Sequence, residues 1–221
     1  MSHIIPATLE FLDEMTIRCV NNFIGDILPQ QARVVLLIEV DGHKTTTEED
    51  AEKVVRICKK NNAITVNIAK DSLETDALTL ARRSALPALS QVRPTTVLED
   101  VSVPPSRLAE MIDGVAHIGK KNRIQIDIFG HAGGGNIHPT ILTDIRDAAE
   151  MARVYKTIEE IFELAVKLEG TITGEHGVGI MKRKYLPMQL DHDTLEAIRA
   201  LKQAFDPQNI LNPGKIFDLE M

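Results

Sequence analysis

Residues 129–138 read FGHAGGGNIH, a glycine-rich stretch between two apolar runs. The first run, Ile124 to Phe129, is strand-like, and the second, Ile137 to Leu142, has the composition of a returning strand. Glycine permits the positive φ angles that a tight turn needs. We therefore predict a strand–loop–strand return at this point, which argues against an all-parallel sheet.

The apolar pattern on both sides of this stretch predicts helices and strands. We expect helices over roughly residues 7–23, 47–60, 71–83, 106–120, 147–168 and 193–205. We expect extended segments over 33–40, 63–69, 95–103, 124–129 and 137–142. This order favours an α+β fold: a ferredoxin-like split βαβ antiparallel sheet with helices on one face, plus a helical C-terminal tail.

Composition limits the class of protein. The chain has 221 residues, enough for one large domain or one and a half ordinary ones, and its 43% hydrophobic and 26% charged residues are typical of a globular protein. Its net charge of −7 argues against a nucleic-acid partner. No apolar run approaches the ~18 residues of a transmembrane segment, and residues 1–6 do not resemble a secretory signal. Two cysteines, Cys19 and Cys58, form no recognisable disulfide framework, so we expect a cytoplasmic location.

Two glycine-rich segments carry the residues with the most distinctive chemistry. His131 and His138 lie in the first, and Glu175 and His176 lie in the second, TGEHGVG at 173–179. Imidazole and carboxylate suit Zn²⁺, Mn²⁺ or Fe²⁺. The alternative is that the histidines cap turns and bind backbone groups. A phosphate loop is less consistent with the sequence, because neither G-x-G-x-x-G nor Gly-Lys-Ser/Thr is present.

For cationic residues outside these segments, we expect ordinary solvent-facing positions. Arg82 lies in a predicted helix, where an arginine normally faces solvent and packs through its methylene stem. The basic run Lys182 to Lys184 is expected to form a solvated face.

Several ordered motifs closely resemble the C-terminal part of FAD-linked oxidases. The branch is that of D-lactate dehydrogenases and the FAD-binding subunit of glycolate oxidase, within the vanillyl-alcohol oxidase-like superfamily. The resemblance extends from about Pro6 to Phe217 and rests on residues 6–11, 99–104, 130–138, 173–179 and 205–215.

The resemblance implies that residues 1–221 are the cap, or substrate, domain of an FAD-dependent D-2-hydroxyacid dehydrogenase. In this family a separate FAD-binding domain precedes the cap, and these 221 residues do not include it. We therefore expect an excised piece, a truncated gene or half of a split enzyme, inactive until joined to its flavin domain in cis or in trans. The implied substrate is a small 2-hydroxy acid such as lactate or glycolate. Without the flavin domain, the apolar face on which that domain would dock is exposed, so we also expect that the chain can form a homodimer. The alternative is a non-catalytic, cap-like binding or partner subunit for a separate flavoprotein.

The resemblance also implies roles for the polar residues. It implies that His131, His138 and Glu175 are ligands of a divalent metal, with Zn, Mn or Fe left open. It implies that His176 is the base that takes the substrate hydroxyl proton while hydride passes to the flavin.

Three further residues are implicated in the same way. Arg82 aligns with the arginine that binds the substrate carboxylate, and Asn212 and Lys215 resemble the tail segment that folds towards the flavin. One position departs from the family pattern, because Gly134 stands where an aspartate is usual. That change removes a carboxylate that could orient the loop, but it removes no implied ligand.

Overall fold

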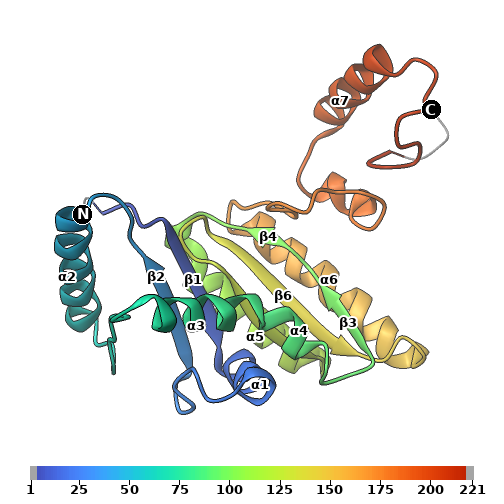
Figure 1. The fold of residues 1–221 in the computed structure, drawn as a ribbon. Helices are drawn as coiled ribbons and strands as arrows, with labels where there is room; N and C mark the ends of the chain where they lie inside the picture. The colour runs from blue at the N-terminus through green and yellow to red at the C-terminus, as the bar shows by residue number, and fades with distance from the viewer. Residues whose placement is uncertain (1–3, 218–221) are drawn as a thin grey trace.

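The computed structural model describes residues 4–217 and contains a six-stranded antiparallel sheet in that range (Figure 1). The strand order is β2-β1-β5-β6-β3, and β4 also pairs with β6. The strands are β1 (Thr8–Asp13), β2 (Val34–Glu39), β3 (Thr95–Leu98), β4 (Val101–Ser102), β5 (Gln125–His131) and β6 (Asn136–Thr143).

The sheet contains the predicted split βαβ unit. Strand β6 lies between β3 and β5 and is antiparallel to both, so β3 and β5 run parallel with one strand between them. The connection between them includes η1 (Pro105–Arg107) and α5 (Leu108–Asn122). The return at the glycine stretch is also confirmed, since Phe129 pairs with His138 and His131 with Asn136.

Helices cover both faces of the sheet, whereas the sequence led us to expect them on one face. On β1, Phe11 packs in the cluster of α5 and α6 (Ala148–Lys167), and its neighbour Leu12 packs on the other side. That side is covered by α1 (Glu14–Ile24), α3 (Ser72–Arg83) and α4 (Ala85–Leu89) (Figure 1). Successive side chains of the central strands are apolar on both faces, so both faces need cover.

Two local predictions are wrong. Residues 7–23 are not one helix, because residues 8–13 form β1 and Asp13 then caps α1 by accepting the N–H of Thr16 at 2.9 Å. Residues 63–69 form no strand in the described structure, and Ile64 is 98% exposed. β-Branched residues favour a strand only where a neighbouring strand supplies hydrogen bonds and cover.

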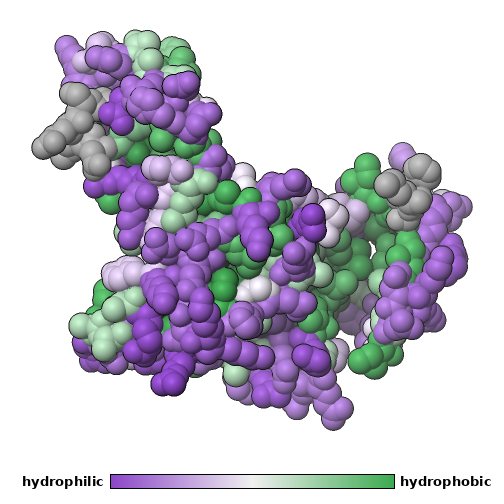
Figure 2. Space-filling model, turned by 180° about the vertical axis from the view of Figure 1, so that it is seen from behind, coloured by the Kyte–Doolittle hydropathy of each residue, from purple (hydrophilic) through white to green (hydrophobic). Residues whose placement is uncertain are grey.

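The part of the chain beside the β2 edge has little packing of its own. Helix α2 (Lys44–Lys60) starts three residues before the predicted Thr47 and has no buried residue in the described structure. Apolar side chains, including Val34, Leu36 and Ile64, are exposed here, and Figure 2 shows apolar surface along the hollow beside this helix.

The C-terminal segment extends away from the sheet (Figure 1) and contains the helix that the sequence predicted for the tail. It contains η2 (Arg183–Met188) and α7 (His192–Phe205). Its last described residues turn back onto the stretch that leads into η2, where the Ile216 N–H donates to the Gly179 carbonyl at 2.8 Å. Within residues 4–217, no helix combines the length and apolarity needed to cross a membrane.

Candidate functional site

The glycine hairpin brings two histidines together at one end of the sheet. His131 ends β5, His138 lies in β6, and their ring centroids are 5.2 Å apart with the rings nearly perpendicular. Both lie on the face of the sheet that carries α3, because His138 pairs with Phe129, whose side chain packs on that side.

Two glycines make this hairpin sterically feasible. At Gly130 a Cβ atom would lie 2.5 Å from the Asn136 carbonyl oxygen. At Gly135 the φ angle is +72°, and a Cβ atom would collide with the Val103 carbonyl oxygen. The chain therefore requires glycine at both positions, whereas Gly134 faces open space.

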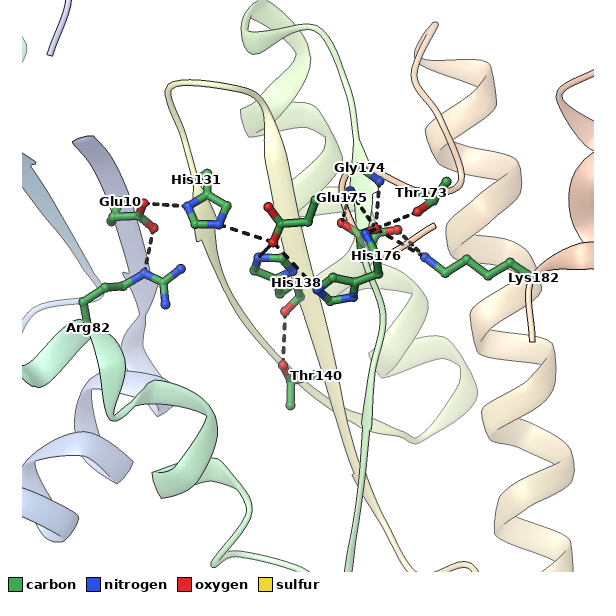
Figure 3. Close-up of polar contacts among 11 residues, drawn as sticks. Glu10, Arg82, His131, His138, Thr140, Thr173, Gly174, Glu175, His176 and Lys182 are labelled. Atoms are coloured by element: carbon green, nitrogen blue, oxygen red, sulfur yellow. Dashed lines mark hydrogen bonds and ion pairs between the residues drawn. The ribbon is translucent and has the colours of Figure 1, made fainter. Parts of the chain in front are cut away.

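Glu175 is the centre of the polar cluster (Figure 3). Its Oε1 lies 3.5 Å from His131 Nε2, 3.4 Å from His138 Nε2 and 3.7 Å from His176 Nε2. Ligands about 2.0–2.1 Å from a tetrahedral ion lie about 3.3–3.4 Å from one another. Each spacing from the carboxylate to an imidazole is therefore close to the distance between two ligands of one divalent cation.

His138 has the protonation state that a metal ligand needs. Its side chain is almost fully buried, and burial, followed by the nearby His131, lowers its pKa to about 4. It is therefore neutral at pH 7, the form that offers a lone pair to a metal. Its Nδ1 is buried and finds no hydrogen-bond partner among residues 4–217.

Asp100 is a site residue that the sequence prediction did not include. Its carboxylate accepts the backbone N–H groups of Gly174 (2.8 Å), Glu175 (3.1 Å) and His176 (3.0 Å), and the hydroxyl of Thr173 (2.8 Å). Burial alone would raise the pKa of Asp100, but these donors and a nearby lysine lower it to about 2.

Asp100 also belongs to a group of possible metal ligands in the described residues. That group contains Asp100, His138, Glu175 and His176, whose ligand atoms lie within 4.8 Å of one another. It includes Asp100 in place of the predicted ligand His131. Four donors already occupy the oxygens of Asp100, and the role of His131 as a ligand stays a prediction.

Lys182 holds the same loop from the other side. Its Nζ donates to the carbonyl oxygens of Asp100 (2.6 Å) and Ile172 (3.0 Å) and lies 3.6 Å from the Asp100 carboxylate. The side chain is buried, which corrects the expectation of a solvated face for this residue. A lysine is buried only where anions and carbonyls surround it, and Asp100 with Glu99 provides them.

Arg82 lies at the edge of the cluster, not in open solvent. Its Nε donates to Glu10 at 2.7 Å, and its guanidinium carbon lies 5.1 Å from the centroid of the Phe129 ring. Glu10 also contacts His131 Nδ1 at 2.6 Å (Figure 3). Within the described range, no hydrogen bond reaches the two Nη atoms of Arg82, so this end of the guanidinium can take a ligand.

Asn212 and Lys215 are not part of this cluster. Both side chains are exposed in the segment after α7, and they share one backbone contact, from the Lys215 N–H to the Asn212 carbonyl. Their expected place near the flavin stays a prediction.

A sheet covered on both faces, with three imidazoles and a carboxylate meeting at one hairpin, defines an α+β domain built around a single polar site. Residues 1–216 match the family model described as "FAD linked oxidases, C-terminal domain", and the chain belongs to this family.

The curated relatives are named as glycolate oxidase subunits or as D-lactate dehydrogenases. The chain is 54% identical over 214 residues to glycolate oxidase subunit GlcD of Bacillus subtilis (strain 168), covering 97% of this chain and 46% of the relative. It is 36% identical to GlcD of Escherichia coli (strain K12), covering 96% and 42%. It is 34% identical to a probable mitochondrial D-lactate dehydrogenase of Danio rerio, covering 96% and 43%. The chain thus spans about half the length of the curated relatives it matches.

Solved structures share the fold at low identity. A substrate-bound p-cresol methylhydroxylase aligns with a TM-score of 0.70 and 13% identity over 97% of this chain and 47% of that one. A 4-ethylphenol oxidase from Gulosibacter chungangensis aligns with a TM-score of 0.61 and the same identity, over 94% and 47%. These likenesses concern the fold alone.

Proposed function

We propose that the chain is the cap, or substrate, domain of an FAD-dependent D-2-hydroxyacid dehydrogenase that oxidises glycolate, D-lactate or a similar acid to the 2-oxo acid. Family membership and the names of the relatives support the reaction class. The observation that carries the proposal is the position of Glu175 Oε1, 3.4–3.7 Å from the Nε2 atoms of three histidines.

In this proposal His131, His138 and Glu175 hold a divalent cation, with Zn²⁺, Mn²⁺ and Fe²⁺ as the options. The donor set fits such an ion, because it combines imidazoles, one of them held neutral by burial, with a carboxylate. When bound, the ion supplies a Lewis acid that favours loss of the substrate hydroxyl proton.

His176 takes the hydroxyl proton on an imidazole nitrogen. Its ring stacks on His138 with centroids 5.3 Å apart, and its side chain is 40% exposed, so a substrate can reach it. Asp100 fixes its backbone through the 3.0 Å N–H contact. A base held within reach of the donor contributes roughly 10²–10⁴-fold to such a proton transfer.

Arg82 binds the substrate carboxylate through its two free Nη atoms. Its Nε is already occupied by Glu10, so the remaining edge of the guanidinium can make two parallel hydrogen bonds to a carboxylate.

The proposed partner is an FAD-binding domain in cis or in trans, and FAD, when bound there, supplies the hydride acceptor. Asn212 and Lys215 are proposed to lie near it. Their segment has apolar side chains available for contact, with Ile210 and Leu211 both exposed. A cytoplasmic location and a homodimer stay predictions.

A non-catalytic partner subunit is the second candidate, and Gly134 is the observation that favours it. The usual aspartate is missing, yet a Cβ atom at this position would meet nothing within 4 Å. If the absent aspartate is the only change that weakens metal binding, Gly134→Asp should fold normally and raise the affinity for Zn²⁺. If the chain has lost metal binding altogether, neither the natural chain nor Gly134→Asp will take up the ion.

The reaction is tested by mixing the chain with FAD and the part of B. subtilis GlcD outside the matched region, and following dye reduction. We expect reduction that depends on D-lactate or glycolate, and that L-lactate does not support. A chelator should abolish it and Zn²⁺, Mn²⁺ or Fe²⁺ should restore it. A mixture that contains flavin and both folded parts, but reduces no dye with either acid, would favour the partner-subunit alternative.

A further inference from the structure

We propose that Glu10 is a positioning residue whose single carboxylate fixes both the tautomer of His131 and the orientation of Arg82. The inference rests on the proposed function, because it concerns the residue that joins a proposed metal ligand to the proposed substrate arginine.

Strand register brings Glu10 to this position. In the antiparallel pair of β1 and β5, Glu10 is directly opposite His131, and Leu12 is opposite Phe129. Directly opposed residues in an antiparallel pair present their side chains on the same face. That face carries α3, the helix of Arg82, so Glu10 lies between the two residues it contacts (Figure 3).

Each oxygen of the carboxylate has its own partner. Oε1 lies 2.6 Å from His131 Nδ1, and Oε2 lies 2.7 Å from Arg82 Nε. The side chain is largely buried, at 14% exposed, so water competes weakly for these contacts. Neither partner can rotate without breaking a short, charge-assisted hydrogen bond.

The contact at Oε1 determines where the proton of neutral His131 sits. A carboxylate can only accept, so Nδ1 must be the donor. The lone pair is then on Nε2, the nitrogen that faces Glu175 at 3.5 Å. The opposite tautomer would set the Nδ1 lone pair against a carboxylate oxygen. Carboxylate partners of this kind orient metal-binding histidines, and their loss typically weakens metal binding about 10–100-fold.

The contact at Oε2 orients the guanidinium. Because Glu10 takes Nε and the Phe129 ring lies beneath the group, the plane of the guanidinium is fixed before a substrate arrives. The Nη edge is left free for a carboxylate. One glutamate thus sets the spacing between the proposed carboxylate-binding group and the proposed metal ligand.

Histidine ¹⁵N NMR on the metal-free 221-residue chain at pH 8 tests the tautomer without any substitution. We expect His131 to carry its proton on Nδ1. A proton on Nε2 instead would overturn the inference.

Zn²⁺ binding, measured by competition with a chromogenic chelator, tests the consequence. We expect Glu10→Gln to lower the affinity about 10–100-fold, because the neutral amide has one acceptor oxygen for the two donors, His131 Nδ1 and Arg82 Nε. Glu10→Asp keeps the charge but shortens the side chain, and we expect an intermediate loss. The matched control is Glu14→Gln, whose exposed carboxylate pairs with Arg18 four residues later. We expect this variant to leave the affinity within about twofold.

His131→Ala separates two explanations for an unchanged Zn²⁺ affinity in Glu10→Gln. If His131→Ala loses affinity while a folded Glu10→Gln keeps the natural value, the role of Glu10 is wrong and the ligand assignment stands. If His131→Ala also keeps the natural affinity, the proposed ligand set itself is wrong, and the role of Glu10 falls with it.

Discussion

At the residue scale, two neighbouring glycines of the hairpin differ in whether a side chain fits at their position. Gly135 has φ +72° and no room for a Cβ atom, whereas Gly134 has open space around it. We expect Gly135→Ala to lower the free energy of unfolding by about 2 kcal/mol or more, and Gly134→Ala to change it by less than about 0.5 kcal/mol. Urea denaturation of the two variants measures both values. Equal losses would mean that the hairpin does not pack against Val103 as described.

A buried carboxyl on the α1 side of the sheet makes stability depend on pH. Burial, followed by the charge of Asp13, raises the pKa of Asp127 to about 7 from its ordinary 3.8. The folded state therefore prefers the protonated form. The stability that Asp127 contributes is complete below about pH 4 and is lost as the pH rises through 7.

Asp127→Asn tests this dependence. The amide stays neutral, so we expect the variant to exceed the natural chain in unfolding free energy by roughly 2–4 kcal/mol at pH 8. At pH 4, close to the ordinary pKa of 3.8, the two should differ by less than about 1 kcal/mol. Urea titrations at both pH values give the comparison, and a variant with the same pH slope as the natural chain would show that Asp127 is not the titrating group.

Residue types alone indicated part of the site. His131, His138, Glu175 and His176 could be selected because unusual chemistry lies on glycine-rich backbone. Glu10 could not, since its role depends on strand register, although it lies in the family-like motif at residues 6–11.

At the element scale, the segment that carries Glu175 and His176 has little regular structure and depends on one carboxylate. Asp100 accepts three successive backbone N–H groups, from Gly174 to His176. The loop amides gain order from a buried anion that also has the Lys182 ammonium 3.6 Å away.

Asp100→Asn should loosen this loop specifically. The amide loses the negative charge and one acceptor, so we expect hydrogen exchange at residues 174–176 to accelerate about 10–100-fold. Exchange in α5 and α6 should not change. The control is Asp147→Asn, because Asp147 also accepts an N–H, from Glu150, but caps α6 away from the site. Unchanged protection at 174–176 in Asp100→Asn would contradict the anchoring role.

Element prediction succeeded where local signals and packing agreed. Asp71 caps α3 as its position suggested, accepting the Glu74 N–H at 2.9 Å. Residues 7–23 failed because their apolar spacing fits a helical stripe, while sheet pairing on two edges recruits residues 8–13 as β1. The Lys182 prediction failed for a related reason, since a basic run says nothing about which of its members meets buried anions.

At the scale of the whole molecule, the proposed function assigns the 221-residue chain one half of an active site. In that proposal the polar cluster supplies a base, a metal-type donor set and the Nη edge of Arg82, and the reaction also needs a hydride acceptor. We therefore expect the isolated chain to purify without stoichiometric flavin absorbance and to reduce no dye with D-lactate. Tight FAD binding by this chain alone would contradict that expectation.

The most direct test of the hydroxyacid site joins this chain to a flavin. The C-terminal half of B. subtilis GlcD is replaced by these residues, and anaerobic bleaching of the flavin is followed after addition of glycolate or D-lactate. We predict bleaching in the chimera, and a rate at least about 10²-fold lower when His176 is changed to alanine. A folded, flavin-containing chimera that stays oxidised with both acids, or that bleaches equally fast with His176→Ala, would contradict the account.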